Sequence, residues 1–445
     1  MTDNDVAQAL VEVALKAGAD QADALVSDSK SVYIGTADRS LEEVERAESH
    51  EAGLRVIVGK GQASIASSDL SPAALQEIAE RAVAIAKATP DDPYSGLADA
   101  DQIGGWPDPA ALELADDSDP LEPSSLEALA RRAEDAAMDV SGVSQVEQAH
   151  AGQDSSRITM LASNGFEGSY SKTSFSVGAS AIAGEGLGRE RDYAGESRRH
   201  FADLPSPEEI GTRAGDRATQ RLGPRKPPGG SVPVLYDRRC SASLIGHFLG
   251  AVNGAAIARG SSWLSEAMDQ MVLPEGLDLI EDPIRVRGAA SRPFDAEGIA
   301  AEVRPIVLDG RLKRWILDCA SARKLGLQTT GNARRGLAGP PSPGTTNTLL
   351  TQGSETRDEL ISAMGTGLIV TSMIGASINS TTGAYSRGAS GFWVENGEIA
   401  YPVNEVTIAG SLPEMMKTLR PANDAEQSRA QIVPSLLVQG LTVGA

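Results

Sequence analysis

The stretch SASLIGHFLGAVNGAAIAR, from Ser241 to Arg259, decides the fold of the second half of the chain and predicts one helix. Its apolar residues recur at steps of three and four positions, which gives the helix one apolar face, formed by Leu244, Phe248, Val252 and Ala255. Glycines recur at every fourth position on another face, at Gly246, Gly250 and Gly254. Because each glycine costs a free helix about 1 kcal/mol relative to alanine, this row predicts a ridge that another backbone approaches closely.

This helix opens a second domain. Residues 223–230 read GPRKPPGG, and no hydrophobic periodicity crosses them, so they mark a domain boundary. A strand-like run follows at 231–236, directly before the helix. We therefore expect an N-terminal domain over 1–223 and a C-terminal domain over 231–445 that carries the helix 241–259.

The N-terminal half shows the same order of elements twice. In 5–88 and again in 124–222, a helix is followed by short strand-like runs, of which 24–26 and 32–34 are the first, and then by a helix that begins at a Ser-Pro pair. Ser71 and Ser206 are the expected caps of these later helices. The repeated order favours an internal duplication. The alternative is that the two halves share only similar helix caps.

Two dipeptides in the C-terminal half predict tight hairpins. Asp309-Gly310 and Asn396-Gly397 each lie between strand-like runs, and both pairs favour the positive φ angles of two-residue turns. Together with the N-terminal pattern, these hairpins predict an α+β fold of two domains, with mostly antiparallel sheets and flanking helices.

The charge balance limits the classes of partner. The chain has 61 acidic and 40 basic residues and a formal net charge of −21, so direct binding to a nucleic-acid backbone is not expected.

No apolar run approaches the roughly 20 residues of a membrane span, and the acidic start of the chain is unlike a signal peptide. Cys240 and Cys319 are too few for a disulfide framework and are expected to be buried and reduced. We expect a cytoplasmic protein.

The four histidines do not form a metal motif. His50, His150, His200 and His247 are far apart in the sequence, and His50-Glu51 would need a second histidine where Leu54 stands. A site assembled from distant histidines stays open. His247, the one titratable ring on the glycine-rich helix, is the candidate catalytic base, but a packed ring at this position would have the same sequence. Near the C-terminus, Tyr385, Arg387 and Trp393 could hold a peptide or a partner's carboxylate, or could pack a hairpin.

The second domain carries a combination of motifs that resembles the TldD/PmbA family. These motifs are GSS (260–262), VLDG (307–310), ARKLG (322–326), TGNARR (330–335), TNT (346–348) and YSRGASG (385–391), and GLRV (53–56) resembles the N-terminal domain of that family. The last C-terminal motif and NGEI (396–399) resemble the PmbA (TldE) branch. The resemblance implies a cytosolic metalloprotease system for unfolded peptides, in which a TldD-type subunit holds zinc and the PmbA-type subunit is its partner. It also implies an indirect link to the modulation of DNA gyrase.

The resemblance also places the family's zinc motif on the helix 241–259. The TldD-type helix reads His-Glu-x-x-x-His-x-x-Glu-Gly-Asp, and alignment through Gly254 puts its two histidines on Ile245 and Gly250. Its general base falls on Gly246 and its later glutamate on Asn253, and the region 385–388 has no cysteine to match the family's metal cysteine. Isoleucine and glycine side chains cannot bind zinc, so no metal, no cofactor and no catalytic residue are expected in this chain.

These observations leave three hypotheses for the function. The first is a PmbA-type subunit, silent alone, that forms a homodimer or heterodimer and binds extended peptides by strand addition beside a TldD-type partner. Its expected contact residues are Asn253, Arg259, Tyr385, Arg387 and Trp393. The second is an autonomous peptidase that uses an unrecognised site with His247, and the third is a peptide-binding protein without a proteolytic role.

Overall fold

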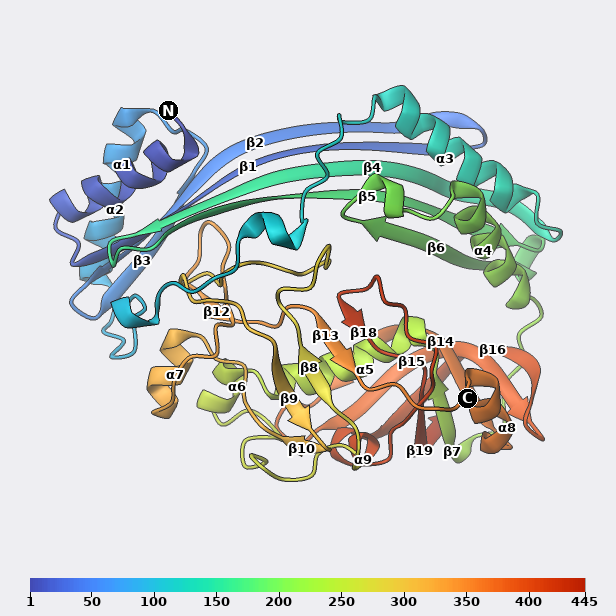
Figure 1. Ribbon diagram of the computed structural model, residues 1–445. Helices are drawn as coiled ribbons and strands as arrows, with labels where there is room; N and C mark the ends of the chain where they lie inside the picture. The colour runs from blue at the N-terminus through green and yellow to red at the C-terminus, as the bar shows by residue number, and fades with distance from the viewer. Residues whose placement is uncertain (445) are drawn as a thin grey trace.

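The computed structural model describes residues 1–444, and its first half is one six-stranded antiparallel sheet. The strands lie in the order β3-β2-β1-β4-β5-β6 and arch over the rest of the molecule (Figure 1). Their bounds are β1 (Gln21–Ala37), β2 (Ser40–Val58), β3 (Gly61–Ser67), β4 (Val143–Ala162), β5 (Glu167–Ala183) and β6 (Glu190–Arg198). β1 and β4 pair at the centre, and the two halves of the sheet meet there.

Each half of the sheet is covered by its own pair of helices. α1 (Asp3–Lys16) and α2 (Pro72–Ala88) pack on β1–β3, and α3 (Pro123–Met138) and α4 (Pro207–Gln220) pack on β4–β6 (Figure 1). Ser71 and Ser206 accept hydrogen bonds from the N–H groups of Ala74 and Glu209, so both predicted caps are confirmed. Both halves therefore follow the order helix, three strands, helix.

The separate short strands expected at 24–26 and 32–34 are wrong, because β1 is one continuous strand. The polar residues from Ser27 to Ser31 pair with β2 on one side and with β4 on the other. Backbone hydrogen bonds on both edges hold these residues extended although their side chains give no apolar alternation. The sequence pattern detected the two buried ends of the strand and missed its middle.

The C-terminal half is built around a small closed barrel. β16, β15, β14, β7 and β19 pair in that order, and a further pairing between β16 and β19 closes the ring. Short β17 extends from β19. The bounds are β7 (Gly230–Tyr236), β14 (Gly367–Ile378), β15 (Ala384–Glu395), β16 (Glu398–Ser411), β17 (Arg420–Pro421) and β19 (Leu436–Gly444).

A second sheet of short strands and several short helices surround this barrel. The sheet has the order β10-β9-β8-β13-β18, and β11 and β12 form a separate pair. The bounds are β8 (Leu279–Glu281), β9 (Arg304–Leu308), β10 (Arg311–Leu312), β11 (Ala333–Arg334), β12 (Ser342–Pro343), β13 (Thr348–Leu350), β18 (Gln431–Ile432), α7 (Cys319–Leu325), α8 (Arg357–Met364) and α9 (Leu412–Lys417). Asp309-Gly310 joins β9 to β10 and Asn396-Gly397 joins β15 to β16, all four residues with positive φ, so both predicted hairpins and the α+β fold are confirmed.

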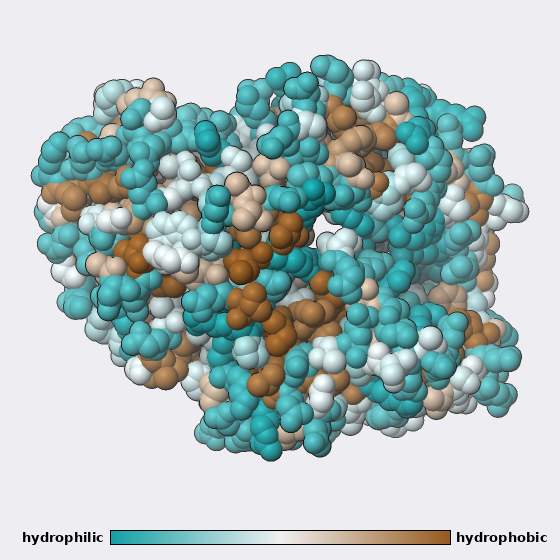
Figure 2. All heavy atoms as spheres, viewed as in Figure 1, coloured by the Kyte–Doolittle hydropathy of each residue, from teal (hydrophilic) through white to brown (hydrophobic). Residues whose placement is uncertain are grey.

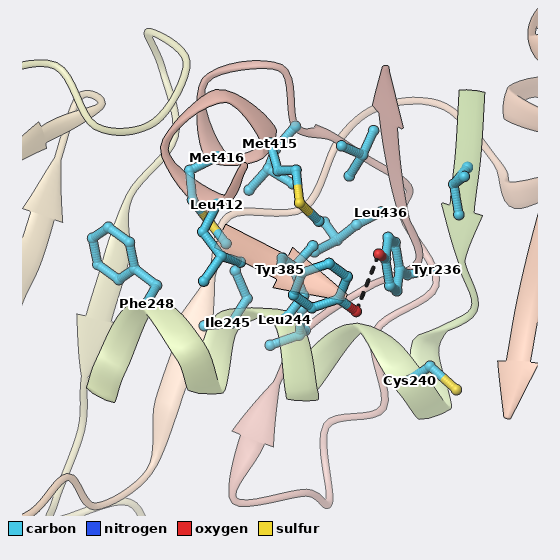
Figure 3. Packing of buried hydrophobic residues seen from close by; sticks show 14 of the residues in the cluster. Tyr236, Cys240, Leu244, Ile245, Phe248, Tyr385, Leu412, Met415, Met416 and Leu436 are labelled. Carbon is cyan, nitrogen blue, oxygen red and sulfur yellow. Dashed lines mark hydrogen bonds between the residues drawn. The ribbon is translucent and has the colours of Figure 1, made fainter. Parts of the chain in front are cut away.

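The predicted helix from Ser241 to Arg259 is wrong in its bounds. α5 (Arg238–Ala251) begins earlier, because Asp237 accepts a hydrogen bond from the Arg239 N–H and caps it. α6 (Gly254–Ala258) is a separate helix, because the Asn253 side chain accepts from the Ala255 N–H and starts a new first turn. The apolar side of α5 lies in the largest core, where Leu244, Ile245 and Phe248 meet residues of α9 (Figure 3).

Ion pairs and aromatic rings join the arched sheet to the C-terminal half. Asp23 of β1 accepts from Arg335, and Arg239 of α5 donates two hydrogen bonds of 2.9 Å to Asp192 of β6. Phe166 packs edge-on to Phe294 with ring centroids 5.1 Å apart. The two halves therefore share buried polar and aromatic contacts.

Among residues 1–444, no helix combines the length and the apolar character that crossing a membrane requires.

Candidate functional site

The glycines of α5 border open space. An added Cβ at Gly246 or Gly250 would meet no heavy atom within 4 Å outside the helix itself. The close backbone approach expected at these two positions is therefore wrong. It does occur at Gly254, where an added Cβ would lie 2.7 Å from the Ile316 carbonyl oxygen. The glycine row thus serves two purposes: one glycine allows close packing, and two leave the helix surface uncovered.

His247 lies on α5 between this open face and the barrel. Its ring packs edge-on to the ring of Tyr385, with centroids 5.8 Å apart. Its Nε2 atom is buried and has no hydrogen-bond partner among residues 1–444. Burial, and then the charge of Arg387, lower the pKa of His247 below its ordinary value of 6.5. The ring is therefore neutral at pH 7, as a base would need to be, but the structure orients neither ring nitrogen through a hydrogen bond.

Arg387 of β15 is fixed beside His247. Its Nε donates to the Gly375 carbonyl oxygen at 2.7 Å, and its Nη1 donates to the Ser243 hydroxyl of α5 at 2.9 Å. These contacts tie the barrel wall to α5 and place a positive charge one turn from the open glycine face. Ser243 is a residue that the sequence analysis missed, although its position four residues before His247 placed it on the same side of the helix.

Two expected contact residues have almost no exposed surface. Tyr385 is 3% exposed and Trp393 is 2% exposed, and both belong to the core around the barrel. The Tyr236 hydroxyl donates to the Tyr385 hydroxyl at 3.3 Å (Figure 3). Of the cluster predicted near the C-terminus, only Arg387 faces the open side of α5, while the two aromatic residues pack the hairpin.

Asn253 and Arg259 mark the two ends of α6. Asn253 caps the helix and its Nδ2 donates to the Pro343 carbonyl oxygen at 2.8 Å, so its side chain has a structural role. Arg259 is the exposed C-cap residue and has no ion-pair partner among residues 1–444. Of the five predicted contact residues, Arg259 and Arg387 are thus the two that carry a positive charge.

The structure keeps the remaining histidines apart. His50 bonds to Asp3, His150 stacks on Tyr33, and His200 bonds to the Glu113 carbonyl oxygen. In the part of the chain that the structure describes, no three His, Cys, Asp or Glu side chains are placed to share a metal ion. Both cysteines are buried, and burial raises the pKa of the Cys240 thiol to about 12.

The residues that the resemblance places at the family's zinc positions carry no group that could bind zinc. Ile245 is 0% exposed and lies in the apolar core, and Gly246 and Gly250 present no side chain at all. Zinc needs imidazole, carboxylate or thiolate donors in a tetrahedral arrangement. Because none of these three residues can donate, no chemical step at this helix can proceed through a bound metal held by them.

Three sequence models of one family match successive parts of the chain. They are described as PmbA/TldA metallopeptidase domain 1 (residues 22–86), central domain (116–222) and C-terminal domain (229–445). This chain belongs to the PmbA/TldD family. The predicted resemblance is thereby confirmed, and the matches extend over most of the chain.

Among relatives in the PmbA/TldD family, the metalloprotease PmbA of Escherichia coli O157:H7 is 35% identical over 416 residues, which covers 93% of this chain and 89% of that protein. The crystal structure of a candidate modulator of DNA gyrase from Bacteroides thetaiotaomicron superposes with a TM-score of 0.91 at 27% identity, covering 99% of this chain and 98% of that one. TldE from Thermococcus kodakarensis has a TM-score of 0.85 at 17% identity, covers 99% of this chain and 100% of its own, and shows the shared fold.

Proposed function

We propose that this chain is the PmbA-type subunit of a cytoplasmic TldD/PmbA metalloprotease system and is silent in peptide hydrolysis when alone. The observation that carries this proposal is that Ile245 and Gly250 stand where the resemblance places the family's zinc ligands, and Gly246 where it places the general base. A glycine cannot take a proton from water, and a buried isoleucine cannot be turned toward a metal without emptying part of the core. Membership of the family supports the rest of the assignment.

In this proposal a TldD-type subunit supplies the zinc, which would activate water for attack on a peptide bond. The present chain would form the other wall of a chamber, enclosed between the two subunits, in which the peptide reaches the zinc. Arg387 offers positive charge beside the uncovered face of α5, and Arg259 offers another charge at the exposed end of α6. The absence of side chains at Gly246 and Gly250 leaves room for an extended backbone. Whether the chain pairs with itself or with the TldD-type subunit depends on which partner is present, and we favour the heterodimer as the active form.

Extended peptides would bind by pairing with a sheet edge. β3 and β6 are the edge strands of the arched sheet, and no strand within residues 1–444 pairs with their outer backbone groups. Strand addition reads backbone rather than side chains, which suits unfolded peptides of varied sequence. The substrate class follows from this argument and from the family resemblance together.

The test is hydrolysis of an unfolded peptide by this chain alone, by a TldD-type subunit alone, and by the two mixed. We expect no cleavage by this chain alone and cleavage by the mixture. His247→Ala is the informative variant, because the competing account makes His247 the base of an autonomous peptidase. Cleavage by the isolated wild-type chain that disappears in His247→Ala would overturn the proposal. Failure of the two subunits to co-purify would instead favour a peptide-binding protein without a proteolytic role.

A further inference from the structure

A cavity lies between the arched sheet and the C-terminal half, and no residue of α5 lines it. It has a volume of about 270 Å³. Strands β1, β4 and β5 form one wall, and the segments around Arg292 and Arg334 form the other. Figure 2 shows that the molecule is hollowed between these two parts and that apolar side chains gather beside the hollow. We call this cavity the arginine pocket; among residues 1–444, its cationic residues without an ion-pair partner are Lys172, Arg199, Arg292 and Arg334.

The four cations of the arginine pocket have no ion-pair partner. Among residues 1–444, no carboxylate oxygen lies within 4.0 Å of a side-chain nitrogen of Lys172, Arg199, Arg292 or Arg334. This is unexpected in a chain with 61 acidic and only 40 basic residues. Arg335, which also lines the cavity, is paired with Asp23 and is therefore not counted among them. The cavity thus concentrates an excess of positive charge in an acidic protein.

Neutral backbone groups hold the arginines of the pocket in place. Arg199 donates to the carbonyl oxygens of Thr173 and Ala289, and Arg292 donates to the Ala333 carbonyl oxygen at 2.6 Å. Arg292 is only 9% exposed, and its Nε is buried without a hydrogen-bond partner in the described chain. A buried, unpartnered donor on a charged group is costly, so its retention points to a ligand.

One carboxylate, that of Asp295, does line the arginine pocket. Its Oδ1 accepts from the N–H groups of Glu297 and Ile299, at 2.8 and 3.0 Å, and its Oδ2 accepts from the Ala333 N–H at 2.9 Å. Burial raises the pKa of Asp295, and the charge of Arg292 opposes this shift. Three backbone donors therefore hold this side chain in place, and this one carboxylate is too little negative charge to balance four cations.

The neighbouring cations act on the pKa of Lys172. Burial, followed by the charges of Arg199 and Arg334, lowers the pKa of Lys172. An anion bound among the three would remove this penalty. Apart from Lys172, the wall formed by β1, β4 and β5 is largely apolar and contains Leu25, Ile158 and Met160, with the rings of Tyr170 and Phe294 beside it. The cavity therefore offers cationic groups and an apolar surface to the same ligand.

We propose that the arginine pocket binds the terminal carboxylate of a peptide whose last side chain is apolar. Guanidinium groups match the planar geometry of a carboxylate, and the apolar wall accommodates the side chain of the terminal residue. The volume falls just below the range of about 300 to 1,000 Å³ that is usual for sites of whole small molecules, which suits one end of a chain. The choice of a peptide among organic carboxylates rests on the proposed function. Inorganic phosphate shares the charge but would leave the apolar wall unused.

The test is isothermal titration of the purified chain, without any partner, with three probes. These are N-acetyl-Ala-Ala-Leu with a free carboxylate, the same tripeptide with a terminal amide, and inorganic phosphate. We expect the free acid to bind at least tenfold more tightly than the amide and to compete successfully with phosphate. Equal affinity for acid and amide, tighter binding of phosphate, or no binding of the acid would overturn the proposal.

Variants separate recognition from folding. Lys172→Gln should weaken binding of the free acid several-fold while keeping or raising the melting temperature, because it relieves repulsion in the empty pocket. Arg334→Gln, at an exposed position, is the second variant should Lys172→Gln fail to fold. Lys60→Gln removes the same charge from the exposed turn between β2 and β3 and should change nothing. Unchanged affinity in both pocket variants would contradict the assignment. Because no TldD-type subunit takes part, this result stands or falls separately from the hydrolysis test.

Discussion

The ring of His247 lies edge-on to the ring of Tyr385, with the two planes inclined by 71°. This contact connects α5 to the barrel, because Tyr385 is buried and bonded to Tyr236 on β7. His247 therefore packs against Tyr385 on one side and borders the open face of Gly246 and Gly250 on the other. Its lowered pKa and its buried, unpartnered Nε2 both follow from that position.

The pH dependence of stability tests this placement of His247. Its folded pKa lies below the unfolded value, so the unfolded chain takes up the proton first as the pH falls through about 6.5. Stability that is present above that pH is thus lost below it. Urea unfolding of the wild type and of His247→Gln at pH 7.5 and pH 5.5 should show a smaller loss in the variant. An equal loss in both proteins would place His247 in solvent. His150, whose pKa burial also lowers, contributes the same trend to both proteins and cancels in the comparison.

Glu297 should give the opposite trend. Burial, and then the charge of Asp295, raise the pKa of Glu297 to about 7. The folded pKa lies above the unfolded value of 4.5, so the stabilising contribution is full below pH 4.5 and is lost as the pH rises through 7. Glu297→Gln should therefore gain stability relative to the wild type between pH 5 and pH 8 in urea unfolding. A constant difference across this range would show that Glu297 is ionised throughout.

The glycines of α5 and α6 should respond in opposite directions to alanine. Gly246→Ala gains helix propensity and meets no atom, so it should stabilise the protein by up to about 1 kcal/mol. Gly254→Ala places a Cβ 2.7 Å from the Ile316 carbonyl oxygen and 2.8 Å from the Ser321 hydroxyl, and should destabilise it by about 1 to 3 kcal/mol. Thermal unfolding of the matched pair provides the measurement. A destabilised Gly246→Ala would mean that the face next to it is covered.

The buried charge of Asp23 should contribute strongly to the stability of the contact between the arched sheet and the C-terminal half. Asp23 is 4% exposed and accepts from both Arg55 and Arg335. Asp23→Asn removes the ion-pair partner of two buried guanidinium groups, and breaking such a pair costs about 3 to 5 kcal/mol. Asp135→Asn, which breaks the exposed pair with Arg39, is the control and should cost about 0 to 1 kcal/mol. Urea unfolding would refute this view of Asp23 if both variants lost the same small amount.

Local signals in the sequence predicted much of the fold. The Ser-Pro caps, the Asp309-Gly310 and Asn396-Gly397 hairpins and the apolar face of α5 are set by residues within one or two turns of each other, and all three were found. The middle of β1 and the break at Asn253 were missed, because one is held by pairing with distant strands and the other by a single capping bond. The division of the chain into domains at 223 and 231 stays a prediction.

The candidate site depended more on contacts between distant parts of the chain. Gly246 and Gly250 have the same sequence signature as Gly254, yet only Gly254 is packed, because only its position faces the Ile316–Leu317 segment. The arginine pocket gave no sequence signal, since Lys172, Arg199 and Arg334 come together only when the arched sheet meets the C-terminal half. Spacing along the chain carries no information about such a cluster.

The zinc content of the isolated chain tests the central claim most directly. Metal analysis of the purified protein, before and after incubation with a slight excess of zinc and removal of the unbound ion, measures whether the chain holds the metal by itself. We predict far less than one zinc per chain in both samples, because Ile245, Gly246 and Gly250 offer no donor. One tightly held zinc per chain would contradict the account and would require a site built from other residues.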